Sequence, residues 1–158
     1  MHVREVFEAG ALGRALAEHG AIDDPADVVA VSGAPVGAGQ LADSYRIELT
    51  LREGARGLRS VFVQLPASDA HSAATAARIG AYQRELRFYQ DLLPRLEIRT
   101  PRLVGTLPVG GDSPGLVLED LSDVARPLDQ LRDGTIGEVD AALSELVGLQ
   151  APVWNDTE

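Results

Sequence analysis

Residues 45–65, YRIELTLREGARGLRSVFVQL, carry two apolar runs on either side of a turn that contains Gly54 and Gly57. In the first run apolar side chains recur at every second position, which is the period of a strand with one buried face: Tyr45, Ile47, Leu49 and Leu51. The second run, residues 61–65, ends at Pro66, a residue that cannot donate to a strand ladder. We therefore predict an antiparallel hairpin at the centre of the fold.

Short apolar runs on both sides of this hairpin predict three further strands, over residues 28–31, 103–107 and 116–118. Residues 33–40, GAPVGAGQ, lie between the first run and the hairpin and are typical of a glycine-rich loop. Together these runs predict a five-stranded antiparallel sheet with the glycine-rich loop at one end.

Helical spacing of apolar residues predicts an N-terminal helix over residues 3–18 and a long helix over residues 69–93, which could break at Gly80. Thr135 and Glu138 have the spacing of a capping box and predict the start of a C-terminal helix. The fold class is therefore α+β, a five-stranded antiparallel sheet packed with a long helix and flanked by two terminal helices. We expect a single domain over residues 1–158, with an N-terminal helix and turn (1–26), a sheet-containing lobe (27–121) and an acidic connector with the last helix (122–158).

The composition excludes several classes of protein. The 158 residues contain no cysteine and no lysine, so disulfides, cysteine nucleophiles and lysine Schiff bases are ruled out. A net charge of −10 argues against a nucleic-acid partner, and no apolar run approaches the roughly 18 residues of a membrane span. The three histidines lack ligand spacing, so we predict no metal site. The first residues do not resemble a signal peptide, and we expect a cytoplasmic protein.

Glu85 stands out because it falls within an apolar stripe of the long helix that includes Tyr82 and Tyr89. Gln64 shares a strand face with Phe62, opposite to the face of Val61. A buried carboxylate must be paired, hydrogen-bonded or protonated. Three interpretations follow: a structural pair in which Gln64 is the neutral partner of Glu85, a carboxyl with a raised pKa that acts as a general acid or base, or an exposed glutamate.

Four stretches, in this order along the chain, resemble the aminoglycoside phosphotransferase superfamily and within it bacterial phosphotransferases related to choline and ecdysteroid kinases. They are PVGAGQLADSYRIEL from Pro35, SVFVQLPASDAHSAATAARIGAYQRELRFYQDLLPRLEIRTPRL from Ser60, LVLEDL from Leu116 and LQAPVWND from Leu149. The resemblance implies a protein-kinase-like N-lobe over residues 27–121.

In that family a glycine loop covers the phosphates of ATP, a strand lysine binds them, a helix glutamate orients the lysine, and a hinge contacts adenine. Mapped onto this chain, the resemblance implies a loop over residues 36–40, including Gly37, Gly39 and Gln40. The helix glutamate would be Glu85, and the hinge would run from Glu119 to Leu121.

Two departures from the family weaken a kinase interpretation. Gln64 stands where relatives carry the lysine, and a neutral amide cannot neutralise phosphate charge as an ammonium does. The motifs of the second lobe, with its catalytic aspartate and metal ligands, do not occur in the sequence. We therefore expect no phosphoryl transfer by this chain alone, and no cofactor.

The leading hypothesis is a repurposed kinase-like N-lobe from a bacterial biosynthetic pathway that binds a small molecule in the former nucleotide cleft. That hypothesis includes catalysis of a non-phosphoryl reaction, such as a cyclisation, isomerisation or elimination, with Glu85 as acid or base and Gln64 orienting the ligand. The remaining candidate ligand contacts are Gly37, Gly39, Gln40, Phe62, Tyr89, Glu119 and Leu121. The alternatives are a pseudokinase-like interaction module or split-enzyme subunit, and a truncated ATP-dependent phosphotransferase. We expect a homodimer in which the apolar face of the last helix is covered.

Overall fold

A computed structural model shows an α+β fold and describes residues 7–37, 40–110, 113–126, 132 and 134–154. Within these residues it contains a five-stranded antiparallel sheet and four α-helices. The predicted fold class is confirmed at this level. No helix among the described residues is long and apolar enough to cross a membrane.

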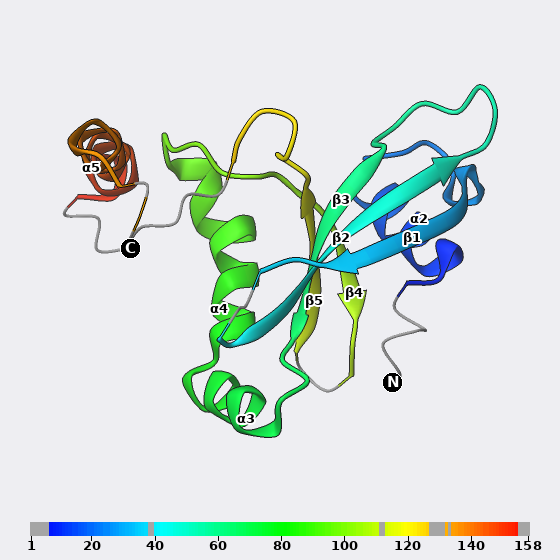
Figure 1. Cartoon of the computed structure of the whole chain (residues 1–158), viewed down its shortest axis with the longest axis horizontal. Coiled ribbons are helices and arrows are strands. Elements are labelled where there is room, and N and C mark those ends of the chain that lie inside the picture. The colour runs from blue at the N-terminus through cyan, green and yellow to red at the C-terminus, as the bar shows by residue number, and fades with distance from the viewer. Residues whose placement is uncertain (1–6, 38–39, 111–112, 127–131, 133, 155–158) are drawn as a thin grey trace. The chain divides into compact units, whose positions relative to one another are not determined.

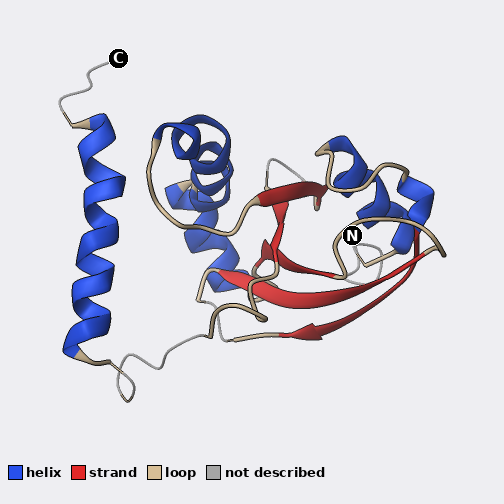
Figure 2. Ribbon diagram, turned by 90° about the horizontal axis from the view of Figure 1, so that it is seen from above, coloured by secondary structure: helices blue, strands red, loops and turns tan. Residues whose placement is uncertain are grey.

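The sheet has the strand order β1-β2-β3-β5-β4, with every neighbouring pair antiparallel (Figure 1). The strands twist along their length, as the view in Figure 2 shows. Their bounds are β1 Val28–Pro35, β2 Ala42–Leu51, β3 Ser60–Pro66, β4 Leu103–Pro108 and β5 Pro114–Glu119.

Two strands extend by three residues or more beyond their predicted ends. β1 continues to Pro35, so Gly33 belongs to the strand and not to the glycine-rich loop, which was the prediction. β2 begins at Ala42 and not at Tyr45. The two extensions have one cause, because Ala34 pairs with Arg46 and Pro35 with Tyr45 in the ladder between the strands. Pairing with β2 thus overrides the turn-like composition of residues 33–35.

The four α-helices are α2 Ala9–Glu18, α3 Ala70–Ile79, α4 Ala81–Arg87 and α5 Ile136–Gln150. The predicted long helix is two helices, since Gly80 adopts a left-handed conformation with φ of 65° and ends α3. After α4 the chain forms a π-helical turn, Phe88–Leu92. Thr135 and Glu138 form the predicted capping box of α5.

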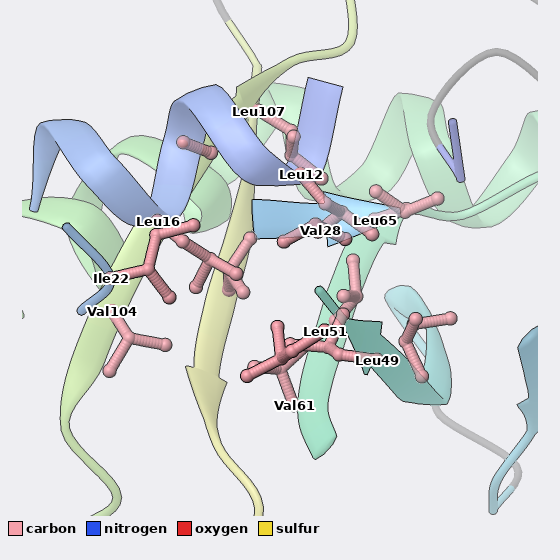
Figure 3. Packing of buried hydrophobic residues seen from close by; sticks show 14 residues of the cluster. Leu12, Leu16, Ile22, Val28, Leu49, Leu51, Val61, Leu65, Val104 and Leu107 are labelled. Atoms are coloured by element: carbon pink, nitrogen blue, oxygen red, sulfur yellow. The ribbon is translucent and has the colours of Figure 1, made fainter. Parts of the chain in front are cut away.

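The core of the sheet lies between α2 and one face of the strands. Leu12 and Leu16 of α2 are fully buried and point toward apolar side chains of the sheet (Figure 3). Every second residue of β3 is buried against this core, in agreement with the predicted alternation: Val61, Val63 and Leu65. The intervening residues of β3, Phe62 and Gln64, therefore lie on the other face, which we call the second face of the sheet.

The chain divides into two compact units. Unit 1 comprises Met1–Leu86 and Arg102–Asp120 and holds the whole sheet, α2, α3 and most of α4. Unit 2 comprises Arg87–Pro101 and Leu121–Glu158 and holds α5. Inside unit 2, the Arg99 guanidinium lies 2.7 Å from the Glu145 carboxylate of α5, which ties the segment before β4 to that helix.

Candidate functional site

The second face brings Gln64 of β3 and Glu85 of α4 together. Gln64 Nε2 donates a hydrogen bond of 3.2 Å to Glu85 Oε2, and both residues are half-buried. This is the contact expected if Gln64 is the neutral partner of Glu85. A hydrogen bond of this kind fixes the direction of the carboxyl but adds no positive charge beside it.

Tyr82, one helical turn before Glu85, holds α4 in place against the sheet. Its hydroxyl donates to the Leu41 carbonyl at 2.7 Å and accepts from the Ala67 amide at 3.1 Å. Leu41 directly precedes β2 and Ala67 directly follows β3. The buried Tyr82 thus joins the helix to the ends of two strands, and Glu85 then faces β3 because residues three apart share one helix side.

Burial raises the pKa of the Glu85 carboxyl above its ordinary value of 4.5, and the hydrogen bond from Gln64 opposes part of that rise. A raised pKa means that the folded state holds the proton more tightly than the unfolded state does. The contribution of Glu85 to the free energy of unfolding is therefore fully present below the pKa of the unfolded state. This contribution is lost as the pH rises through the pKa of the folded state. Ionised Glu85 destabilises the fold at neutral pH.

We therefore expect Glu85→Gln to unfold at a higher temperature than the wild type at pH 7, with the difference disappearing near pH 4. The control is Asp69→Asn, which also removes one carboxylate from unit 1. A hydrogen bond from Ser72 at the start of α3 lowers the pKa of Asp69, so its ionised form stabilises the fold and the variant should lose stability at pH 7. Thermal unfolding monitored by circular dichroism from pH 4 to pH 8 makes the comparison, and the same sign for both variants would contradict the assignment.

A second polar pair on this face joins β2 to the end of β5. Arg46 Nε lies 2.6 Å from Asp120 Oδ2, and the Asp120 side chain is 7% exposed against 37% for Arg46. Arg46 Nη1 also lies 3.3 Å from Glu48 Oε1. Asp120 directly follows β5, and Arg46 compensates its buried charge.

A shallow hollow of about 220 Å³ lies beside this pair, on the hairpin of β1 and β2. It is lined by Ser32, Gly33, Ala34, Arg46 and Glu48. The register places Ala34, Arg46, Phe62 and Leu118 in one row across four strands. The hollow and Phe62 therefore share the second face with Gln64.

The other predicted contacts fall in different places. Gly37 is exposed with φ of 72°, Gln40 is exposed, and Gly39 lies outside the described residues. Glu119 is bound to Arg102, with Nε and Nη2 at 3.1 and 3.2 Å, and a hydrogen bond from Arg102 lowers its pKa. Tyr89 and Leu121 belong to unit 2, where the Tyr89 ring packs edge-on against Phe88.

Sequence reasoning missed Arg46 and the three β1 residues of the hollow. The one available signal for Arg46 was its position on the polar side of the β2 alternation, next to Phe62 in the expected hairpin. Its partner Asp120 lies 74 residues away, which no local pattern indicates. Within the described residues, no group of three or more histidine, aspartate or glutamate side chains could hold a metal ion.

Comparison with known proteins adds no relative to these observations. No protein-family model matches the chain. A search of the curated proteins finds no significant match. The family assignment therefore stays a prediction that rests on the four stretches quoted above.

Proposed function

We propose that unit 1 is a kinase-like N-lobe whose second face binds a compact small molecule and does not hold the phosphates of ATP. The observation that carries the proposal is the hydrogen bond between Gln64 and Glu85. In the resembled family this pair would be a lysine and a glutamate, and the Gln64 amide puts no positive charge at the position where the family binds the triphosphate.

Three features of the fold support a kinase-like origin. The strand order β1-β2-β3-β5-β4 accommodates the implied loop between β1 and β2, and Gly37 in that loop has a positive φ. A helix glutamate contacts the third strand, as the resemblance implies. β5 ends at Glu119, the residue at which the implied hinge begins.

The hollow beside Arg46 limits the kind of ligand. Its volume of about 220 Å³ is below the 300–1,000 Å³ that is usual for sites of drug-sized ligands. Its charged groups are the Arg46 guanidinium and the Glu48 carboxylate, which together suit a molecule with both hydrogen-bond donors and acceptors. We therefore propose a compact neutral or zwitterionic metabolite, with Glu85 available for proton transfer to a ligand that reaches Gln64.

Calorimetric titration tests the proposal with nucleobases, amino acids and short amides as probes. We expect at least one probe to bind with a Kd in the micromolar range, and Mg·ATP to show no binding up to about 1 mM. Ala34→Phe should fill the hollow and abolish that binding, whereas Thr50→Phe, an exposed position on the same face of β2, should retain it. Micromolar binding of Mg·ATP, or unchanged probe binding by Ala34→Phe, would contradict the proposal.

A second candidate function, an interaction module or split-enzyme subunit, is favoured by α5. Its apolar side chains recur at helical spacing and are exposed in the structure: Ile136, Val139, Leu143, Leu146 and Val147. An apolar helix face of this kind is typical of an interface. Co-purification of a second protein that is lost on Leu143→Glu would favour this candidate over a small-molecule binder.

A further inference from the structure

β1 is an edge strand of the sheet. β1 lies at the end of the sheet and, among the described residues, pairs only with β2. Its sequence, VVAVSGAP, contains no charged residue. Edge strands are usually protected by charged side chains, bulges or proline; within the described residues β1 has a bulge between Val28 and Ala30 and a proline, Pro35, at its end.

The ladder shows which backbone groups of β1 face outward. The Val36 amide donates to the Ser44 carbonyl, so an even-numbered residue on the β1 side bonds toward β2. The Leu49 amide donates to the Arg59 carbonyl, so an odd-numbered residue of β2 bonds away from β1. Because hydrogen-bonded pairs alternate along an antiparallel ladder, the even-numbered residues 30–36 direct their backbone groups to β2. Val31 and Gly33 therefore direct theirs outward, while Pro35 offers only a carbonyl.

We infer that β1 pairs antiparallel with β1 of a second copy of this chain, about a two-fold axis at Ser32. In this register Val31 and Gly33 exchange main-chain hydrogen bonds with Gly33 and Val31 of the second copy. Ser32 faces Ser32 of the second copy, and Ala34 faces Ala30 of the second copy. Every facing pair is small and uncharged, so the strand is complementary to itself and the contact is isologous.

Charge and size set the strength of this dimer. Each chain carries a net charge of −10, so the copies repel one another at long range, whereas the facing strands bring no like charges together. A contact confined to one strand also belongs to the small end of protein interfaces. The dimer should therefore depend on concentration and become tighter as salt screens the repulsion.

The inferred dimer also affects the hollow on the second face. Ser32, Gly33 and Ala34 line that hollow and form the edge that pairs. Because the two-fold axis is perpendicular to the sheet, the second faces of both copies lie on the same side of the joined sheets. The hollows of the two copies then lie next to one another at the axis. The pairing itself does not depend on the proposed ligand.

The absence of cysteine from the sequence allows a direct test by single-cysteine cross-linking. Facing residues in a non-hydrogen-bonded pair have Cα atoms about 4.5 Å apart, within the range of a disulfide. Ser32→Cys should therefore give a disulfide-linked dimer under mild oxidation. Ala34 is the matched control, because it is exposed on the same face of β1. In Ala34→Cys the two sulfurs would be offset by four residues, about 13 Å along the strands, so no disulfide-linked dimer should form.

Sedimentation equilibrium of the unmodified chain from about 10 µM to about 1 mM should show a monomer–dimer equilibrium that Ser32→Lys shifts to monomer. Thr50→Lys, which adds the same charge on the same face one strand away, should leave it unchanged. A monomer at every concentration and salt would overturn the inference. Failure of Ser32→Cys to cross-link, or equal cross-linking by Ala34→Cys, would overturn it as well.

Discussion

Replacing Leu16 by alanine should lower the free energy of unfolding by about 3 kcal/mol, because the residue is fully buried at the contact of α2 with the sheet. The side chain lies in one apolar cluster with residues of β2, β3, β4 and β5. Truncation would remove its contacts and leave a cavity that these paired strands cannot close. Urea denaturation monitored by circular dichroism gives the difference directly.

Ile79→Ala is the control for this prediction. Ile79 ends α3 in the same unit and its side chain is 44% exposed, so its truncation should lower the unfolding free energy by less than about 1 kcal/mol. Equal losses in the two variants would mean that α2 does not pack on the sheet as described.

Arg46→Ala should also be strongly destabilising, by about 3 kcal/mol, because it leaves the buried Asp120 carboxylate without its arginine. Asp120→Ala should have the smaller effect, about 1 kcal/mol, although it breaks the same ion pair. The remaining Arg46 is 37% exposed, can be hydrated and keeps its contact with Glu48. The two variants differ in their loss of unfolding free energy because Arg46→Ala leaves a buried carboxylate, whereas Asp120→Ala leaves a partly exposed guanidinium.

Chemical denaturation of both variants at pH 7 measures this difference. Arg102→Ala is the control, because Arg102 and Glu119 form a more exposed pair, at 68% and 28%, and such pairs contribute about 0–1 kcal/mol. An Asp120→Ala variant that is less stable than Arg46→Ala would show that burial of the carboxylate does not govern the energy of this pair.

The faces of the sheet could be predicted from the sequence, since the alternation in residues 45–51 and 61–65 places Ile47 and Val63 in the core, where the structure has them. The inward position of Glu85 was predicted for a similar reason, because its spacing from Tyr82 keeps both on one helix side. These are local signals, set by the geometry of a single strand or helix.

The features that sequence reasoning missed depend on contacts between distant segments. β1 runs to Pro35 only because β2 is beside it, and Ser32 and Ala34 enter the hollow through that pairing. Arg46 and Asp120 meet because β2 and β5 both flank β3. Buried Asp27 is a further case, since it is compensated by Arg52, the residue that follows β2.

The Tyr82 hydroxyl has a mechanical consequence. It bonds to Leu41, the residue that precedes β2, and to Ala67, the residue that follows β3, while its own helix carries Glu85. One phenol ring therefore sets the distance between the ends of two strands and the helix turn that precedes the carboxyl.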